Sequence, residues 1–200
     1  MLKIFHAPGA RSLRVIWLCE ELGIPYEVAR ERLGRPSDDF AKVSPTQALP
    51  SIIDGDVVMS ESVAIMMYLL AKHGETDLAP GPGSPAFPDY LQYLHYGESS
   101  LAAFVTPMVR TMFLAPEDQR NNFTMQALRG MYAGRLKLLD SVLAQRPYVA
   151  GENFTAADIS VGYGLSLGER LNLGDTFPAE VRDYWTMLQQ RDAFKRAAAV

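Results

Sequence analysis

Two short groups of residues in the first third of the chain have the types and spacing to bind a ligand that carries a carboxylate. Leu49 and Pro50 stand directly before an apolar run at 51–53, and Glu61 and Ser62 open an apolar helical pattern. Proline donates no backbone N–H, so it belongs at the start of a strand, and its peptide bond can be cis. A polar group at a helix N-terminus suits a carboxylate, because free N–H groups and the positive end of the helix dipole point at it. These residues therefore predict a binding site for an anionic ligand.

The residues between the two groups predict a hairpin that leads into a helix. Asp54 and Gly55 supply a tight turn between the apolar runs 51–53 and 57–59. The following helix begins near Glu61 and carries apolar residues at helical spacing. The segment therefore predicts loop, strand, turn, strand and helix, in that order.

The start of the chain predicts a strand, a helix and a second strand. Residues 2–6 form a short apolar run, and apolar residues then recur at helical spacing until Gly23 and Pro25 end the helix. Residues 26–28 read as the second strand. A strand–helix–strand order implies a parallel pair with a right-handed crossover. The first seventy residues thus predict a small α/β domain of the order βαβ–ββα.

A segment rich in proline and glycine at 74–88 separates this domain from a helical remainder. Such a run forms neither a helix nor a central strand. Helical periodicity dominates afterwards, and Thr155 with Asp158 forms a capping box that opens one of the helices. We therefore predict an α/β domain at 1–73, a linker at 74–88 and an all-helical domain at 89–200.

Composition narrows the range of functions. A net charge of −4 over 200 residues gives no electrostatic footprint for nucleic acid. The single Cys19 excludes an internal disulfide and fits a reducing compartment. No apolar run is long enough to cross a bilayer, and no histidine has a second ligand at metal-binding spacing. These features predict a cytoplasmic protein that uses no metal and binds neither membrane nor nucleic acid.

The Leu-Pro, hairpin, Glu-Ser, helix arrangement resembles the glutathione site of the cytosolic glutathione S-transferases. The resemblance extends over the whole chain, since these proteins combine a thioredoxin-like βαβ–ββα domain with an all-helical domain. It implies that Pro50 is cis, that the Leu49 backbone pairs with the cysteinyl backbone of glutathione, and that Glu61 and Ser62 anchor the γ-glutamyl group. Gln47 stands where the family has glycine, and its side chain is a further candidate contact for the peptide.

The same resemblance places the thiol chemistry in the loop after the first strand. Transferases use glutathione as the thiolate, which is the nucleophile. We assign the sulfur contact to Ser12 and a supporting or co-substrate role to Arg11; Ser12 could equally serve as the N-cap of the helix. The loop departs from the family, because Ala10 replaces the serine of many members and Arg11 the cysteine of bacterial ones. Arg14, close by, reads as a solvated arginine with a packed stem.

The second substrate is expected between this loop and the first helices of the helical domain. Aromatic and methionine side chains there would suit a flat apolar electrophile, although a stripe at helical spacing is also typical of a core. The candidates for this wall are His6, Tyr96, Phe104 and Met108.

The resemblance predicts a homodimeric enzyme that conjugates glutathione to a small electrophile. Three other glutathione-dependent reactions remain open, namely isomerisation, dehalogenation and disulfide reduction. An acidic isomerase substrate would need cations such as Arg11. A protein of another class, a non-catalytic transferase-like binding module, also remains open, because Ala10, Arg11 and Gln47 depart from the family pattern.

Overall fold

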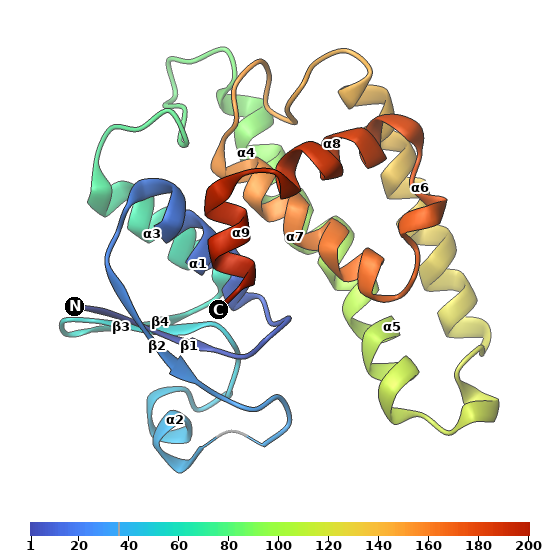
Figure 1. Cartoon of the computed structure of the whole chain (residues 1–200), viewed down its shortest axis with the longest axis horizontal. Helices are drawn as coiled ribbons and strands as arrows, with labels where there is room; N and C mark the ends of the chain where they lie inside the picture. Colours follow the sequence, from blue (N-terminus) through green and yellow to red (C-terminus); the bar gives the residue numbers. More distant parts are fainter. Residues whose placement is uncertain (36) are drawn as a thin grey trace. The chain divides into compact units, whose positions relative to one another are not determined.

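The computed structural model describes every residue except 36 and divides the chain into two compact units. Unit 1 comprises Met1–Thr76 and Gln190–Val200, and unit 2 comprises Asp77–Gln189. Unit 1 holds all the strands of the described residues, whereas unit 2 is helical (Figure 1). The predicted fold class, a small α/β domain followed by helices, is confirmed.

A four-stranded mixed sheet forms the centre of unit 1, in the order β2-β1-β3-β4. The central strands β1 and β3 are antiparallel, and β1 pairs in parallel with β2, as the strand–helix–strand order predicted. Ile4 of β1 and Ile52 of β3 are fully buried and face each other across the ladder. The strands are β1 (Leu2–His6), β2 (Tyr26–Arg30), β3 (Ser51–Asp54) and β4 (Val57–Ser60).

Helices α1 (Ser12–Leu22) and α3 (Ser62–His73) lie side by side on one face of this sheet (Figure 1). The short helix α2 (Asp38–Val43), which the sequence analysis did not anticipate, lies on the opposite side, and its Phe40 stacks on Phe5 at 4.9 Å between ring centroids. The candidate site residues Arg11 and Ser12 stand at the N-terminal end of α1, and Glu61 and Ser62 stand at the N-terminal end of α3.

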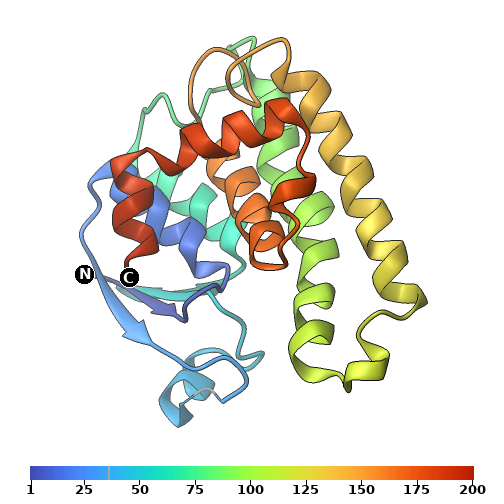
Figure 2. The same cartoon turned by 45° about the vertical axis from the view of Figure 1, so that its right-hand side comes forward.

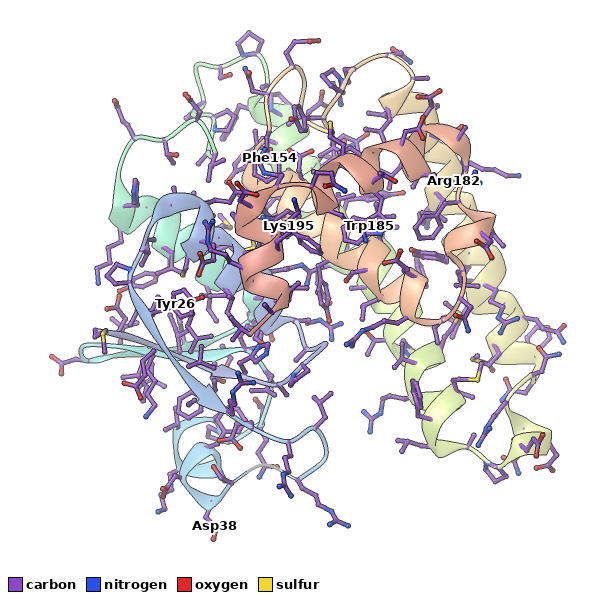
Figure 3. The ribbon with its side chains drawn as sticks, viewed as in Figure 1. Tyr26, Asp38, Phe154, Arg182, Trp185 and Lys195 are labelled. Atoms are coloured by element: carbon purple, nitrogen blue, oxygen red, sulfur yellow. The ribbon has the colours of Figure 1, made fainter. Side chains whose placement is uncertain are left out.

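The last helix, α9 (Asp192–Ala198), packs against α1 and so belongs to unit 1. Trp17 meets Phe194 edge-to-face at 4.8 Å, and Arg191 holds the Glu21 carboxylate at 2.7 and 2.8 Å. The hydroxyl of Tyr26 on β2, labelled in Figure 3, donates to the carboxylate of Glu20 on α1 at 2.6 Å. The observed division thus differs from the predicted one in this segment, since 190–200 are grouped with the α/β unit.

Unit 2 is built from helices, and α4 packs against α7 while α5 packs against α6 (Figure 2). The predicted capping box at Thr155 is present, with Asp158 accepting from the Thr155 backbone at 2.7 Å. No helix in the part of the chain that the structure describes is long and apolar enough to cross a membrane. The elements are α4 (Phe87–Tyr96), the π-helical η1 (Gly97–Ala102), α5 (Ala103–Leu114), the 3₁₀ turn η2 (Glu117–Gln119), α6 (Phe123–Leu143), α7 (Ala156–Arg170), the 3₁₀ turn η3 (Gly174–Thr176) and α8 (Ala179–Gln189).

Candidate functional site

The β3–β4 hairpin brings the two groups singled out in the sequence to one end of the sheet. Ser51 pairs with Ser60 in the antiparallel register. Pro50 directly precedes Ser51, and Glu61 directly follows Ser60. The Leu-Pro segment and the Glu-Ser segment therefore leave adjacent positions of paired strands, which places them side by side as one site needs.

Hydrogen bonds between hydroxyl groups connect the loop before Pro50 with the strand before Glu61. Ser51 Oγ donates to the Ala48 carbonyl oxygen at 2.9 Å and lies 2.8 Å from Ser60 Oγ. A hydroxyl has one hydrogen to donate, so Ser60 is the donor in the second bond. Ser51 is fully buried. This network holds the loop before Pro50 against the strand that leads to Glu61.

The loop at 47–50 has the backbone that the sequence analysis expected. The Leu49–Pro50 peptide bond is cis. Leu49 is partly exposed, while Pro50 is buried. Gln47 is exposed and has a φ of 52°, a left-handed conformation that a residue other than glycine rarely adopts. The prediction that Pro50 is cis is confirmed.

Glu61 and Ser62 form the junction between β4 and α3. Glu61 occupies the N-cap position with φ 73° and ψ 104°, a sparsely populated conformation of the kind that clusters at binding and catalytic sites. Its side chain is exposed, whereas Ser62 keeps only 3% of its surface. This junction presents a carboxylate side chain and a helix N-terminus at the same place.

Arg14 is the residue whose environment was predicted wrongly. Instead of lying at the surface, its side chain is fully buried, and Nη1 donates to Ser62 Oγ at 3.2 Å. The apolar periodicity of α1 gave no signal for this burial, because Ser62, the partner of Arg14, lies 48 positions away in the sequence. A buried guanidinium thus lies directly behind the N-terminus of α3.

The loop before α1 places Ser12 and Arg11 differently from the prediction. Arg11 is the N-cap residue of α1 and makes no side-chain capping bond; Ser12 is the first helical residue, so the N-cap alternative for Ser12 is wrong. Ser12 has no exposed surface, and its Oγ lies 2.9 Å from Nδ1 of the buried His6. Burial, and secondly the charge of Arg30, lowers the pKa of His6. A ligand atom reaches Arg11 more readily than Ser12.

The residues predicted to line a second-substrate wall fall in both units. His6 belongs to unit 1 and contacts Ser12. In unit 2, Met108 is fully buried, and buried Tyr96 donates its hydroxyl hydrogen to the Arg135 carbonyl oxygen at 3.0 Å. These placements favour the core interpretation for Met108 and Tyr96. Phe104 is half-buried, and the Arg135 guanidinium lies 5.6 Å from its ring centroid.

Two other expectations concern cysteine and metals. Cys19 is fully buried, and burial raises its pKa to about 12, so this thiol is an inert core residue. Among the residues other than 36, no three histidine, cysteine or acidic side chains are grouped so that they could hold a metal ion.

Comparison with known proteins gives concordant results for both halves of the chain. A sequence profile of the glutathione S-transferase N-terminal domain matches residues 4–77. Glutathione S-transferase 3 of Schizosaccharomyces pombe is 27% identical over 214 residues, covering 99% of this chain and 87% of that protein. The structure of glutathione S-transferase III in its apo form is 25% identical with a TM-score of 0.82, covering 100% of this chain and 96% of the other.

A further solved structure agrees in fold. A glutathione transferase family member from Pseudomonas fluorescens, solved with two glutathione molecules bound, has a TM-score of 0.87 at 24% identity, over 98% of this chain and 92% of that one. The fold and the hairpin site define a protein with a thioredoxin-like domain followed by an all-helical domain. Within that class, the profile over residues 4–77 and the whole-length relatives show that this chain is similar to glutathione S-transferases.

Proposed function

We propose that this protein is a glutathione transferase that binds glutathione at the open end of the β3–β4 hairpin. The observation that carries the proposal is the juxtaposition of Leu49-Pro50 and Glu61-Ser62 by the Ser51–Ser60 pair. In this proposal the Leu49 backbone pairs with the cysteinyl backbone of glutathione, and exposed Gln47 is a further polar contact at the edge of the same loop.

The γ-glutamyl group carries one negative and one positive charge, and the junction before α3 offers a partner of suitable charge for each. The N-terminus of α3 and the Ser62 hydroxyl suit the α-carboxylate, since helix N-termini stabilise anions. The exposed Glu61 carboxylate would repel that group but suits the α-ammonium. We therefore propose that Ser62 binds the α-carboxylate and that Glu61 binds the α-ammonium group.

Activation of the thiol is assigned to the first turn of α1. A free thiol has a pKa near ~8.5, and lowering it by about two units needs roughly 2.7 kcal/mol. A hydrogen bond to a charged group supplies about 1.5–3 kcal/mol, and a helix N-terminus adds about 0.3–1 kcal/mol. Ser12 and Arg11 remain the two candidate residues. The complete burial of Ser12 against the partial exposure of Arg11 favours Arg11.

The nature of the electrophile belongs to this proposal as well. We propose conjugation to a small apolar electrophile, with half-buried Phe104 as the remaining aromatic candidate of the predicted wall. A cationic Arg11 beside the sulfur would also suit an acidic co-substrate, as an isomerase needs, so this alternative is retained. By resemblance, we expect the protein to be a homodimer in the cytoplasm. Sedimentation analysis of the purified protein tests the dimer, because it measures the mass of the particle in solution.

The test combines binding with turnover. Reduced glutathione is titrated into the wild type, Ser62→Ala and, as a matched serine control on unit 2, Ser141→Ala. Ser141 is exposed, and its hydroxyl, the group that the substitution removes, donates to the Leu138 carbonyl of its own helix. The proposal expects saturable binding that only Ser62→Ala weakens, and conjugation with at least one member of an electrophile panel. Binding without any turnover would favour the non-catalytic module, and no binding at millimolar glutathione would reject the proposed site.

A further inference from the structure

The buried Arg14 side chain gives the Ser62 hydroxyl a fixed direction. Arginine has only N–H donors and no acceptor, so Ser62 Oγ must be the acceptor in the 3.2 Å bond from Arg14 Nη1. The hydroxyl hydrogen of Ser62 is then not used in this bond and can be donated to another group. Without the guanidinium, the same hydroxyl would be free to turn and donate inward.

The charge of Arg14 acts in the same direction as this hydrogen bond. The guanidinium is fully buried, and a charge in a low-dielectric interior is screened much less than one at the surface. Ser62 is the first residue of α3, so the guanidinium and the positive end of the helix dipole lie at the same place. Both favour a negative charge beside Ser62.

We propose that Arg14 is a positioning residue for the ligand carboxylate, acting through Ser62. It holds the Ser62 hydroxyl as a hydrogen-bond donor and strengthens the anion preference of the α3 N-terminus. The inference rests on the proposed glutathione site, and it assigns selectivity for a carboxylate at the γ-glutamyl end to a residue of α1.

Three ligands separate this role from a merely structural one. Reduced glutathione carries both the α-carboxylate and the α-ammonium group. Glutaryl-cysteinyl-glycine keeps the carboxylate and lacks the amine, and 4-aminobutanoyl-cysteinyl-glycine keeps the amine and lacks the carboxylate. Their dissociation constants are measured calorimetrically for the wild type, Arg14→Met and Arg14→Lys. Arg196→Met is the control, because it removes an arginine that pairs with Glu20 on the same α1 helix.

We expect Arg14→Met to weaken the binding of the two ligands that carry the α-carboxylate and to spare the ligand that lacks it. Arg14→Met weakens glutathione and the glutaryl peptide by about tenfold or more, the effect of a hydrogen bond to a charged group. It changes the affinity for the aminobutanoyl peptide less than about twofold, because that ligand has no group for the Ser62 donor. Arg14→Lys keeps the charge, so it should retain more of the preference for the glutaryl over the aminobutanoyl peptide than Arg14→Met does. Arg196→Met should retain this preference in full.

A second comparison tests whether Arg14 acts through Ser62. In a Ser62→Ala background, Arg14→Met should weaken glutathione binding by a smaller factor than in the wild type. An equal factor in both backgrounds, or equal weakening of all three ligands by Arg14→Met, would overturn the inference. If the wild type itself binds none of the ligands, the proposed function fails instead.

Folding is monitored in parallel, since substitution of a buried arginine can unfold the protein. The calorimetric stoichiometry reports the active fraction, and the ratio of affinities for the glutaryl and aminobutanoyl peptides does not depend on it. Should Arg14→Met fail to fold, Arg14→Gln takes its place, because it keeps an N–H donor but loses the charge. The ratio should then still fall several-fold, and an unchanged ratio contradicts the proposal.

Discussion

Nδ1 of His6 lies 2.9 Å from Oγ of Ser12, and both side chains are buried. Within the described residues, His6 Nε2 has no hydrogen-bond partner. A buried N–H without a partner is rarer than a buried acceptor without one, which favours the tautomer with the hydrogen on Nδ1. His6 then donates to Ser12, and the pair is an internal contact between β1 and α1. Ser12 keeps its own hydroxyl hydrogen in this arrangement, but its side chain has no exposed surface, so the residue chosen from the sequence for the sulfur contact lies inside the fold.

The first prediction therefore separates Arg11 from Ser12 in thiol activation. We expect Arg11→Ala to raise the pKa of bound glutathione by about one unit, because it removes a charged neighbour. Ser12→Ala should raise it by less than about 0.3 unit, since buried Ser12 has no surface for the sulfur. Ultraviolet absorbance of the thiolate, recorded across pH, gives both values. The reverse order would restore Ser12 as the activating residue.

The second prediction concerns the pH dependence of stability. The pKa of His6 is lowered by burial and by Arg30, so the unfolded chain binds the proton more tightly than the folded protein does. The neutral ring stabilises the fold above the unfolded pKa of about 6.5, and this contribution is lost as pH falls below that value toward the folded pKa.

Replacement of His6 should therefore make the free energy of unfolding less dependent on pH below about 6.5, the pKa of an unfolded histidine. Urea unfolding between neutral and mildly acidic pH compares the wild type with His6→Gln and with a control, His95→Gln, whose side chain is exposed. If the wild type and His6→Gln lose the same free energy of unfolding as the pH falls, groups other than His6 cause the loss.

The third prediction is that Cys19 does not react in the folded protein. Burial, and secondly the charge of Glu20, raises its pKa to about 12, and the thiolate is the reactive form. Iodoacetamide at mildly alkaline pH should label the native protein no faster than the protein unfolds, and label the urea-unfolded chain promptly. Rapid native labelling would mean that α1 opens without global unfolding.

The fourth prediction uses two kinds of helical glycine in unit 2. A Cβ on Gly97 would lie 2.3 Å from the backbone of Ser160, which cannot move aside as a flexible side chain can. Gly97→Ala should lower the free energy of unfolding by about 1–3 kcal/mol or more, the usual cost of overpacking. Gly130 in α6 has open space around it, so Gly130→Ala should raise stability by about 0.5–1 kcal/mol. Equal effects in a urea titration would contradict the close η1–α7 contact.

The parts of the fold that follow from local sequence were predictable. The hairpin turn at Asp54-Gly55, the capping box at Thr155 and the proline before β3 each have a local physical cause, and the structure contains all three. The side-by-side placement of Pro50 and Glu61 was also predictable, because an antiparallel register fixes which ends of two strands meet.

The parts that depend on long-range packing were not predictable. Periodicity gave no reason to bury the cation of Arg14, since its partner Ser62 lies 48 positions away in the sequence. Likewise Ser12 has the residue type for a cap or a catalytic hydroxyl, and only the position of His6 on the adjacent strand shows how the side chain is used. The docking of α9 onto α1 depends on Glu20 and Glu21, which read locally as solvated charges.

The most direct test of the central claim is a calorimetric titration of the purified protein with reduced glutathione at several pH values, in buffers of different ionisation enthalpy. The buffer dependence counts the protons released on binding. The account predicts saturable binding with proton release near neutral pH, because the site would hold glutathione as the thiolate. Binding without proton release would contradict thiol activation, and no binding at millimolar glutathione would contradict the site itself.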